Sequence, residues 1–189
     1  MNLAELTAEV ISWTNRPDLT GPTQSAIRRV TLALHRKHAF WRDLSAITKT
    51  TLNQVDSVAL TEFTRFRGLS HVINTATGKP LDIVTADDLW DPLTGAQRTD
   101  IVFAAGNTLN IRLSASSNSI TFYYFQDPDI STSSYASWIA DTQPDAIISG
   151  AVHRVLSERG ETAIANVALQ AYMEEERALL AANNLVEIR

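Results

Sequence analysis

Apolar residues recur at steps of three and four near both ends of the chain. Leu3, Leu6, Val10 and Trp13 follow this spacing, which predicts a short helix over residues 3–13. The same periodicity predicts helices over about residues 20–38, 142–160 and 161–182. One face of the last helix is predicted to hold Ile164, Val167, Ala168, Ala171, Tyr172, Ala178 and Leu179.

The middle of the chain has a different pattern, in which short runs rich in Thr, Val, Ile and aromatic residues are separated by Gly, Asn, Asp and Pro. Gly106 and Asn107 predict a hairpin turn, because both residues tolerate positive φ. Leu109 and Ile111 alternate with polar residues, which is typical of an antiparallel sheet with one buried face and one solvent-exposed face. Strands are predicted over residues 45–52, 57–63, 69–75, 81–84, 100–105, 108–114 and 119–125.

The order of these elements predicts the fold class. Strands follow one another instead of alternating with helices, which favours an α+β fold over a parallel doubly wound one. We expect the N- and C-terminal helix pairs to form a helical bundle with an inserted antiparallel β-rich region. The bundle would comprise residues 1–42 and 141–189, including a C-terminal tail, and residues 43–140 would form the β-rich region and a connecting loop.

The composition of the chain argues against several classes of function. The chain has 189 residues, of which 44% are hydrophobic and 20% are charged, as expected for a globular domain. Cysteine is absent, which excludes disulfides and thiolate zinc sites. The net charge of −5 argues against tight binding of nucleic acid, which usually needs a basic face. The first 13 residues lack the basic start of a signal peptide, and no apolar run reaches the ~18 residues of a membrane span. We therefore expect a soluble protein made in the cytoplasm, with no membrane partner.

Several polar clusters were weighed as chemical sites, and each has a simpler structural interpretation. His35 and His38 could share a metal, but a third ligand is missing. His153 and Ser157 are neighbours on one helix, without the Gly-rich turn or oxyanion donors of a hydrolase. The remaining clusters are explained better by turns, caps or a solvated face: Asp87, Asp88 and Asp91; Asp127 and Asp129; Glu174, Glu175 and Glu176. We expect no enzyme activity, cofactor or metal.

The stretch from Phe122 to Ala151 joins the strands to the C-terminal helices. It begins with four aromatic residues, whose alternate members are expected to serve the β core. Thr142 with Asp145 resembles a capping box at the start of a helix, and Gly150 inside that helix suggests close approach of another backbone. Trp90 and Trp138 lie in polar loops, where each is either a core-edge residue or part of a protein interface.

Four segments of the chain resemble one family. They are "WTNRPDL" (13–19), "AIRRVTLALHRKHAFWRDL" (26–44), "YYFQDPDIS" (123–131) and "SWIADTQPDAIISGAV" (137–152). Their order and spacing resemble the head-to-tail adaptors of tailed double-stranded DNA phages, of the connector or tail tubular protein A type. Each motif is short, and the likeness extends from one end of the chain to the other.

The resemblance implies a virion structural protein at the head–tail neck, assembled in the host cytoplasm. Such adaptors form a homo-oligomeric ring, commonly twelvefold, beneath the portal protein. The ring joins the capsid to tail or nozzle proteins and lets DNA pass without specific binding. The strand-rich part would face the tail, and the C-terminal segment would reach the portal. The candidate portal or subunit contacts are Trp138, Tyr135, Trp90, Leu185, Val186, Ile188 and Arg189.

Two other functions stay open at this point. Another neck protein, such as a tail-completion or tail-terminator protein, shares the location and would bind assembled tails. An unrelated α+β enzyme or ligand-binding domain would place its pocket at the aromatic loop around Trp138.

Overall fold

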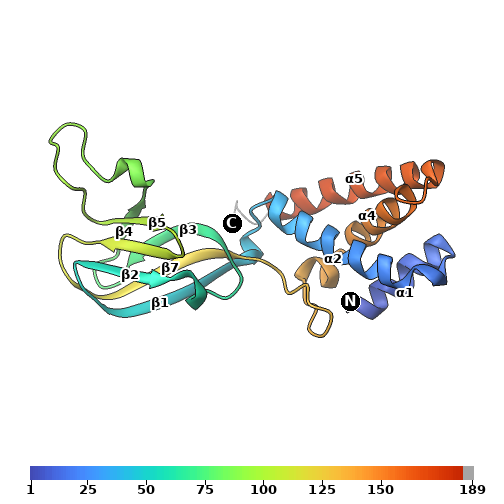
Figure 1. Ribbon diagram of the computed structural model, residues 1–189, viewed down its shortest axis with the longest axis horizontal. Coiled ribbons are helices and arrows are strands. Elements are labelled where there is room, and N and C mark those ends of the chain that lie inside the picture. The colour runs from blue at the N-terminus through green and yellow to red at the C-terminus, as the bar shows by residue number, and fades with distance from the viewer. Residues whose placement is uncertain (185–189) are drawn as a thin grey trace. The chain divides into compact units, whose positions relative to one another are not determined.

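The computed structural model describes residues 1–184, with the side chains of residues 51, 118 and 184 left aside. The chain divides into two compact units (Figure 1). One unit consists of Met1–Arg42 and Asp127–Arg189 and contains the α-helices. The other consists of Asp43–Gln126 and contains the strands. Each unit has its own hydrophobic core.

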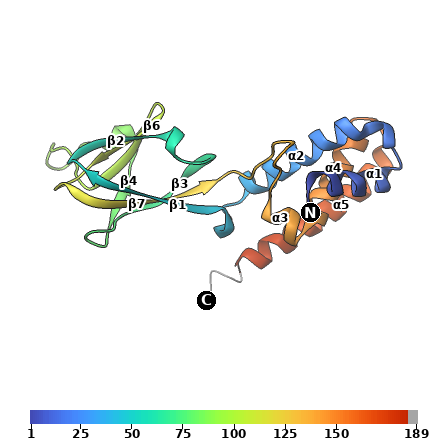
Figure 2. The same ribbon diagram turned by 90° about the horizontal axis from the view of Figure 1, so that it is seen from below.

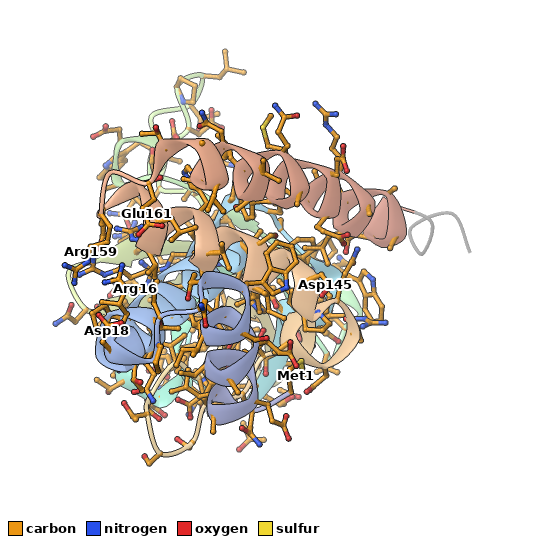
Figure 3. All side chains as sticks on the ribbon, turned by 90° about the vertical axis from the view of Figure 1, so that its right-hand side faces the viewer. Met1, Arg16, Asp18, Asp145, Arg159 and Glu161 are labelled. Carbon is orange, nitrogen blue, oxygen red and sulfur yellow. The ribbon has the colours of Figure 1, made fainter. Side chains whose placement is uncertain are left out.

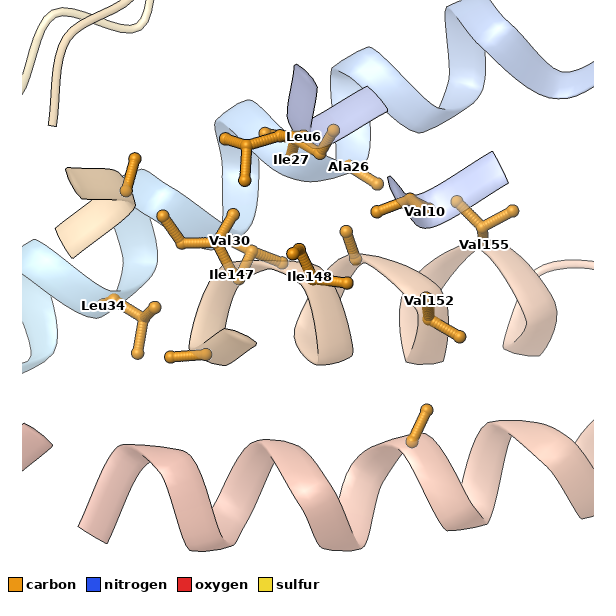
Figure 4. Close-up of a cluster of buried hydrophobic side chains, with 14 of the residues drawn as sticks. Leu6, Val10, Ala26, Ile27, Val30, Leu34, Ile147, Ile148, Val152 and Val155 are labelled. Atoms are coloured by element: carbon orange, nitrogen blue, oxygen red, sulfur yellow. The ribbon is translucent and has the colours of Figure 1, made fainter. Parts of the chain in front are cut away.

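The helical unit is built around one buried helix, α4. Nine of the fourteen residues of α4 are buried, and the helix contacts α1, α2, α3 and α5. Val30, Ile147 and Ile148 lie between α2 and α4 in Figure 4, and α5 covers the opposite side of α4. The helices are α1 (Leu3–Thr14), α2 (Thr20–Lys37), α3 (Trp138–Thr142), α4 (Pro144–Ser157) and α5 (Thr162–Asn184), with a 3-10 turn at Pro17–Leu19.

The connections α1–α2 and α4–α5 meet at one end of this unit. Arg16 donates hydrogen bonds to Asp18, with Nε 3.0 Å from Oδ1, and its Nη1 lies 3.2 Å from Oε1 of Glu161. Figure 3 shows these three side chains beside Arg159. Two residues of the "WTNRPDL" motif, Arg16 and Asp18, therefore hold two helical connections together.

The second unit is a single sheet of seven strands in the order β1-β7-β3-β4-β5-β6-β2. All neighbouring pairs are antiparallel except β4 and β5, which are parallel. The strands are β1 (Leu44–Leu52), β2 (Val55–Ala59), β3 (Phe66–Asn74), β4 (Lys79–Ile83), β5 (Ile101–Ala105), β6 (Thr108–Arg112) and β7 (Ser117–Gln126), with 3-10 turns at Trp41–Asp43, Leu60–Glu62 and Ala86–Asp88.

A short connection forces this sheet to curl. β1 and β2 form its two edges, although only residues 53 and 54 separate them in the sequence. Adjacent strands are about 4.8 Å apart, so the edges of a flat seven-stranded sheet would lie about 29 Å apart. The link between β1 and β2 can span at most about 11 Å. The sheet therefore curls into the half-barrel seen in Figure 2.

Each of the seven strands contributes to the core of the curled sheet. Phe63 is central, because its ring lies 5.2 Å from that of Tyr124 and 5.7 Å from that of Phe122. The other two aromatic residues of "FYYF" serve the opposite face of β7, where Tyr123 stacks on His71 at 4.2 Å. The buried residues are Leu52, Val58, Phe63, Val72, Leu81, Val102, Leu109, Ile111, Leu113, Ile120, Phe122 and Tyr124.

The predicted fold class, a helical bundle of two helix pairs with an inserted antiparallel β-rich region, is wrong. The structure is an α+β fold with a seven-stranded curled sheet and five α-helices. The strands form a half-barrel with a core of its own, and the parallel β4–β5 pair makes the sheet mixed. Residues 138–140, expected to lie in the connecting loop, belong to an additional short helix, α3, which extends to residue 142. Thr142 ends that helix and does not cap α4, whose first turn starts after Gln143.

Gly150 gives a prediction for the packing of α4. A Cβ atom at this position would lie 2.8 Å from Cγ1 of Val30 and 2.9 Å from Cδ2 of Tyr172. Because Val30 is buried, Gly150→Ala should lower the free energy of unfolding by about 1–3 kcal/mol. Urea unfolding followed by the helical circular dichroism signal measures this change.

Gly21→Ala is the matched control, since no atom lies within 4 Å of the added Cβ and the residue is in the first turn of α2. This substitution should be neutral or slightly stabilising. An equal effect of the two substitutions would contradict the close packing of α2, α4 and α5.

Candidate interaction site

The segment between β7 and α3 is fixed along one side of α2. Arg36 Nη2 lies 2.6 Å from Oδ2 of Asp127, and Arg28 Nη1 donates to Oγ1 of Thr132 at 3.2 Å. Residues 28, 31, 35 and 36 of α2 all contact this segment, and their spacing places them on one side of a helix. Two arginines of α2, Arg28 and Arg36, therefore bind this segment.

Tyr135 is held by the same side of α2. Its hydroxyl oxygen lies 2.7 Å from Oγ1 of Thr31, which itself donates to the carbonyl of Ile27. Burial raises the pKa of Tyr135 to about 12, and the hydrogen bond with Thr31 opposes that rise in part. The side chain packs against the helical core. The structure thus places Tyr135 against helices of its own unit.

Trp138 lies in an aromatic cluster at the start of α3. Ser137 caps this helix through Ala140 N, and the Ser137 hydroxyl lies 2.9 Å from Nε2 of His35. The Trp138 ring meets the Phe40 ring edge-on, with centroids 5.1 Å apart. The cap and the ring contacts together fix the orientation of Trp138.

A pocket opens beside Trp138. The Arg42 guanidinium lies 5.1 Å from the Trp138 ring centroid and 5.4 Å from that of Trp41, so it lies over both rings. The pocket has a volume of about 190 Å³. Its wall consists of Trp41, Arg42, Trp138, Thr142, Gln143, Leu179, Ala182 and Asn183. Trp138 therefore faces both the core of its unit and this pocket, which has a cationic and aromatic lining.

Trp90 is distant in sequence from this cluster and lies in the loop between β4 and β5, drawn in green in Figure 1. The loop is internally bonded: Trp90 bridges to Gln97, and Asp91 N donates to the carbonyl of Ala96 at 2.8 Å. The Asp91 carboxylate accepts a hydrogen bond from Leu93 N, which lowers the pKa of Asp91. Trp90 is 54% exposed and Leu93 is 93% exposed. The loop thus presents two large apolar side chains from an ordered backbone.

The remaining predicted contacts, Leu185, Val186, Ile188 and Arg189, lie outside the described residues. Among residues 1–184, the structure brings Tyr135 and Trp138 into one segment and leaves Trp90 in another unit.

Three features of the helical unit were not predicted from the sequence. Trp41 and Arg42 were not expected to line a pocket with Trp138. Ile164 and Val167, predicted on the same helix face as Ala168 and Leu179, are 56% and 66% exposed, whereas Ala168 and Leu179 are buried. The sequence does contain a signal for this difference in exposure. The spacing of Ala165, Ala168 and Leu179 defines one face of a helix without Ile164 or Val167.

Glu176 is the third missed feature, since the three consecutive glutamates were expected to be mostly solvated. Glu176 is buried, with Oε1 2.7 Å from Nζ of Lys37 and 2.9 Å from Nε2 of His38. Burial alone would raise the pKa of Glu176, but the hydrogen bonds from Lys37 and His38 outweigh it and lower the pKa. This carboxylate therefore ties the end of α2 to α5. Glu174, two residues earlier, is exposed.

His35 and His38, the candidate metal pair, do not converge on one site. His35 contacts Ser137, whereas His38 contacts Glu176. His153 Nδ1 lies 3.0 Å from the Ala165 carbonyl and 3.4 Å from Ser157 Oγ. Within residues 1–184, no group of three or more acidic, His or Cys side chains is arranged to hold a metal ion. None of the helices described combines the length and apolarity that crossing a membrane requires.

Comparison with protein families gives a match over nearly all of the sequence. The family model described as SU10 adaptor protein matches residues 1–187, which is nearly the whole chain. Curated proteins give no match to this chain.

Glu176 gives a prediction for the pH dependence of stability. Glu176→Gln should lower the free energy of unfolding at neutral pH by about 1–2 kcal/mol, because charge-assisted hydrogen bonds weaken and Lys37 is partly solvated. Since the folded pKa is lowered, this stabilisation exists above the unfolded pKa and disappears as the pH falls through the folded pKa. Urea unfolding at a series of pH values measures it.

The wild-type chain should therefore lose more stability than Glu176→Gln between about pH 6 and pH 3. Glu174→Gln is the control on the same helix and should change the stability by less than about 0.5 kcal/mol. Parallel pH profiles for wild type and Glu176→Gln would show that the buried carboxylate does not stabilise the fold.

Proposed function

The chain belongs to the SU10 adaptor family of phage head-to-tail adaptors, and from this premise we propose that it forms a ring beneath the portal. The ring joins the capsid to the tail and lets DNA pass. The match over residues 1–187 carries the proposal, because it includes both units of the chain. The family is one of structural proteins, so the proposed role is mechanical and not catalytic.

The charge of the chain supports a role as a DNA conduit. Each copy has a net charge of −5, so a ring of twelve copies would carry roughly −60. Like charge discourages DNA from adhering to the wall of a channel. Basic residues of α2 that could attract phosphate are partly occupied, since Arg36 binds Asp127 and Arg28 binds Thr132.

We assign the candidate contacts to partners on this basis. The loop that carries Trp90 and Leu93 contacts tail or nozzle proteins, because an ordered loop with exposed apolar side chains loses little entropy on binding. Leu185, Val186, Ile188 and Arg189 contact the portal protein. Trp138 acts through the pocket that it shares with Trp41 and Arg42, whereas Tyr135 is bonded to Thr31 and does not line this pocket.

The proposal predicts templated assembly. The chain alone should be a monomer or a weak oligomer, and adding the portal protein of the same phage should produce a complex with a ring of about twelve copies, in line with closed heterologous symmetry. Native mass spectrometry measures both states, with the portal alone as the control. Binding to assembled tails and not to the portal would assign the chain to another class of neck protein. A stable free dodecamer would contradict templated assembly.

The same assay tests the Trp90 loop. Trp90→Ala should leave both the stability of the chain and ring formation on the portal unchanged. It should weaken binding of tail proteins to the ring by about tenfold or more, as for an interface hot spot. Trp13→Ala, another exposed tryptophan, is the matched control. If Trp90→Ala no longer forms a ring on the portal, the loop lies on the portal side of the ring and not on the tail side.

A further inference from the structure

An apolar stripe runs along α5 beside the side that is buried in the helical core. We call it the outer stripe and define it by Ile164, Val167, Ala171, Glu174 and Ala178. At 100° per residue these positions lie within about 80° of one another on the helix. Ile164 and Val167 are 56% and 66% exposed, although large apolar side chains at such a spacing normally face a partner. Glu174 is the only charge in the stripe.

A groove lies on the other side of the same helix. Its volume is about 470 Å³, and Val30, Gly150, Leu169 and Tyr172 form its apolar part. Arg29 and Ala33 line the α2 side of the groove. His153, Arg154, Ser157 and Glu158 complete its polar part, and there Arg154 and Glu158 pair with each other at 3.4 Å. Val167 and Leu169 are two residues apart, which separates them by about 200° around α5. The outer stripe and the groove therefore cannot meet within one copy of the chain.

Glu174 on the outer stripe and Arg29 in the groove carry complementary charges. Glu174 and Arg29 are both exposed, and within residues 1–184 neither has a hydrogen-bond or ion-pair partner. A stripe-to-stripe dimer would place two Glu174 carboxylates on the same contact and repel. A contact of the stripe with the groove brings Glu174 toward Arg29 and covers Ile164 and Val167. Such a contact joins two different surfaces and is heterologous, as ring closure requires.

We propose that the outer stripe of α5 in one copy occupies the α2–α4–α5 groove of the next copy, with Glu174 facing Arg29. The inference rests on the proposed ring and names the surface that closes it. The occupant of the groove is a second copy of this chain, because the chain itself supplies both the apolar stripe and the matching charge.

The absence of cysteine makes the test direct. A disulfide needs two Cα atoms within about 7 Å, so it reports contact at residue level. In the double variant Val167→Cys/Ala33→Cys, oxidation on the portal should yield a ladder of linked copies up to the full ring. Val167→Cys and Ala33→Cys should each give no ladder alone, and a mixture of the two should stop at linked pairs. Ala33→Cys/Thr77→Cys, with the second cysteine in the sheet unit, is the matched control.

Each other outcome has a defined meaning. Linked dimers from Val167→Cys alone would show a stripe-to-stripe contact and overturn the proposal. Capture of the portal protein by Val167→Cys would make the stripe a portal contact and also overturn it. If native mass spectrometry shows the ring but the double variant gives no ladder, the interface is wrong while the ring stands. If no ring forms with the wild-type chain, the proposed function fails first.

Charge reversal gives a second readout that needs no disulfide. Glu174→Arg and Arg29→Glu should each reduce the yield of portal-bound ring by about five- to tenfold, since each places like charges together. The double variant Glu174→Arg/Arg29→Glu should restore most of the yield. Equal losses in both single variants without recovery in the double variant would overturn the Glu174–Arg29 contact.

Discussion

The close approach of α2 and α5 over Gly150 is the constraint on which the helical unit depends. With no side chain at this position, Val30 and Tyr172 pack directly over the backbone of α4. This buries α4 among the other helices and makes it the centre of the unit. It also fixes the surface, because Val30, Gly150 and Tyr172 belong to the groove, and the outer stripe lies on the far side of α5.

The function proposed for the chain follows from surfaces and not from a reactive centre. Several charged side chains hold segments of the helical unit together: Arg16 joins two connections, Arg36 fixes the segment after β7, and Glu176 ties α2 to α5. Apolar side chains that would normally be buried are exposed at the Trp90 loop and on α5. A structural protein of the SU10 adaptor family needs such surfaces to contact its neighbours.

Local patterns predicted the elements but not their partners. The spacing of Leu3, Leu6 and Val10 and the alternation of Leu109 and Ile111 reflect burial of one side of each element, so these elements lie where expected. The parallel pairing of β4 with β5 and the curl of the sheet depend on contacts between distant residues, which periodicity does not encode. The short helix α3 was missed because its cap, Ser137, is recognisable only with its contact to His35. The site was predictable only in part: Trp90 is exposed and Trp138 lies in a pocket, but Trp41, Arg42 and the outer stripe needed the tertiary structure.

The most direct test of this account is a cryo-EM reconstruction of the portal with the chain bound. We predict a closed ring beneath the portal in which Val167 of each copy lies against Ala33 of the next, with Glu174 near Arg29. A ring in which Ile164 and Val167 face solvent would contradict the proposed interface. A portal with no ring of this chain would contradict the central claim that the chain is its adaptor.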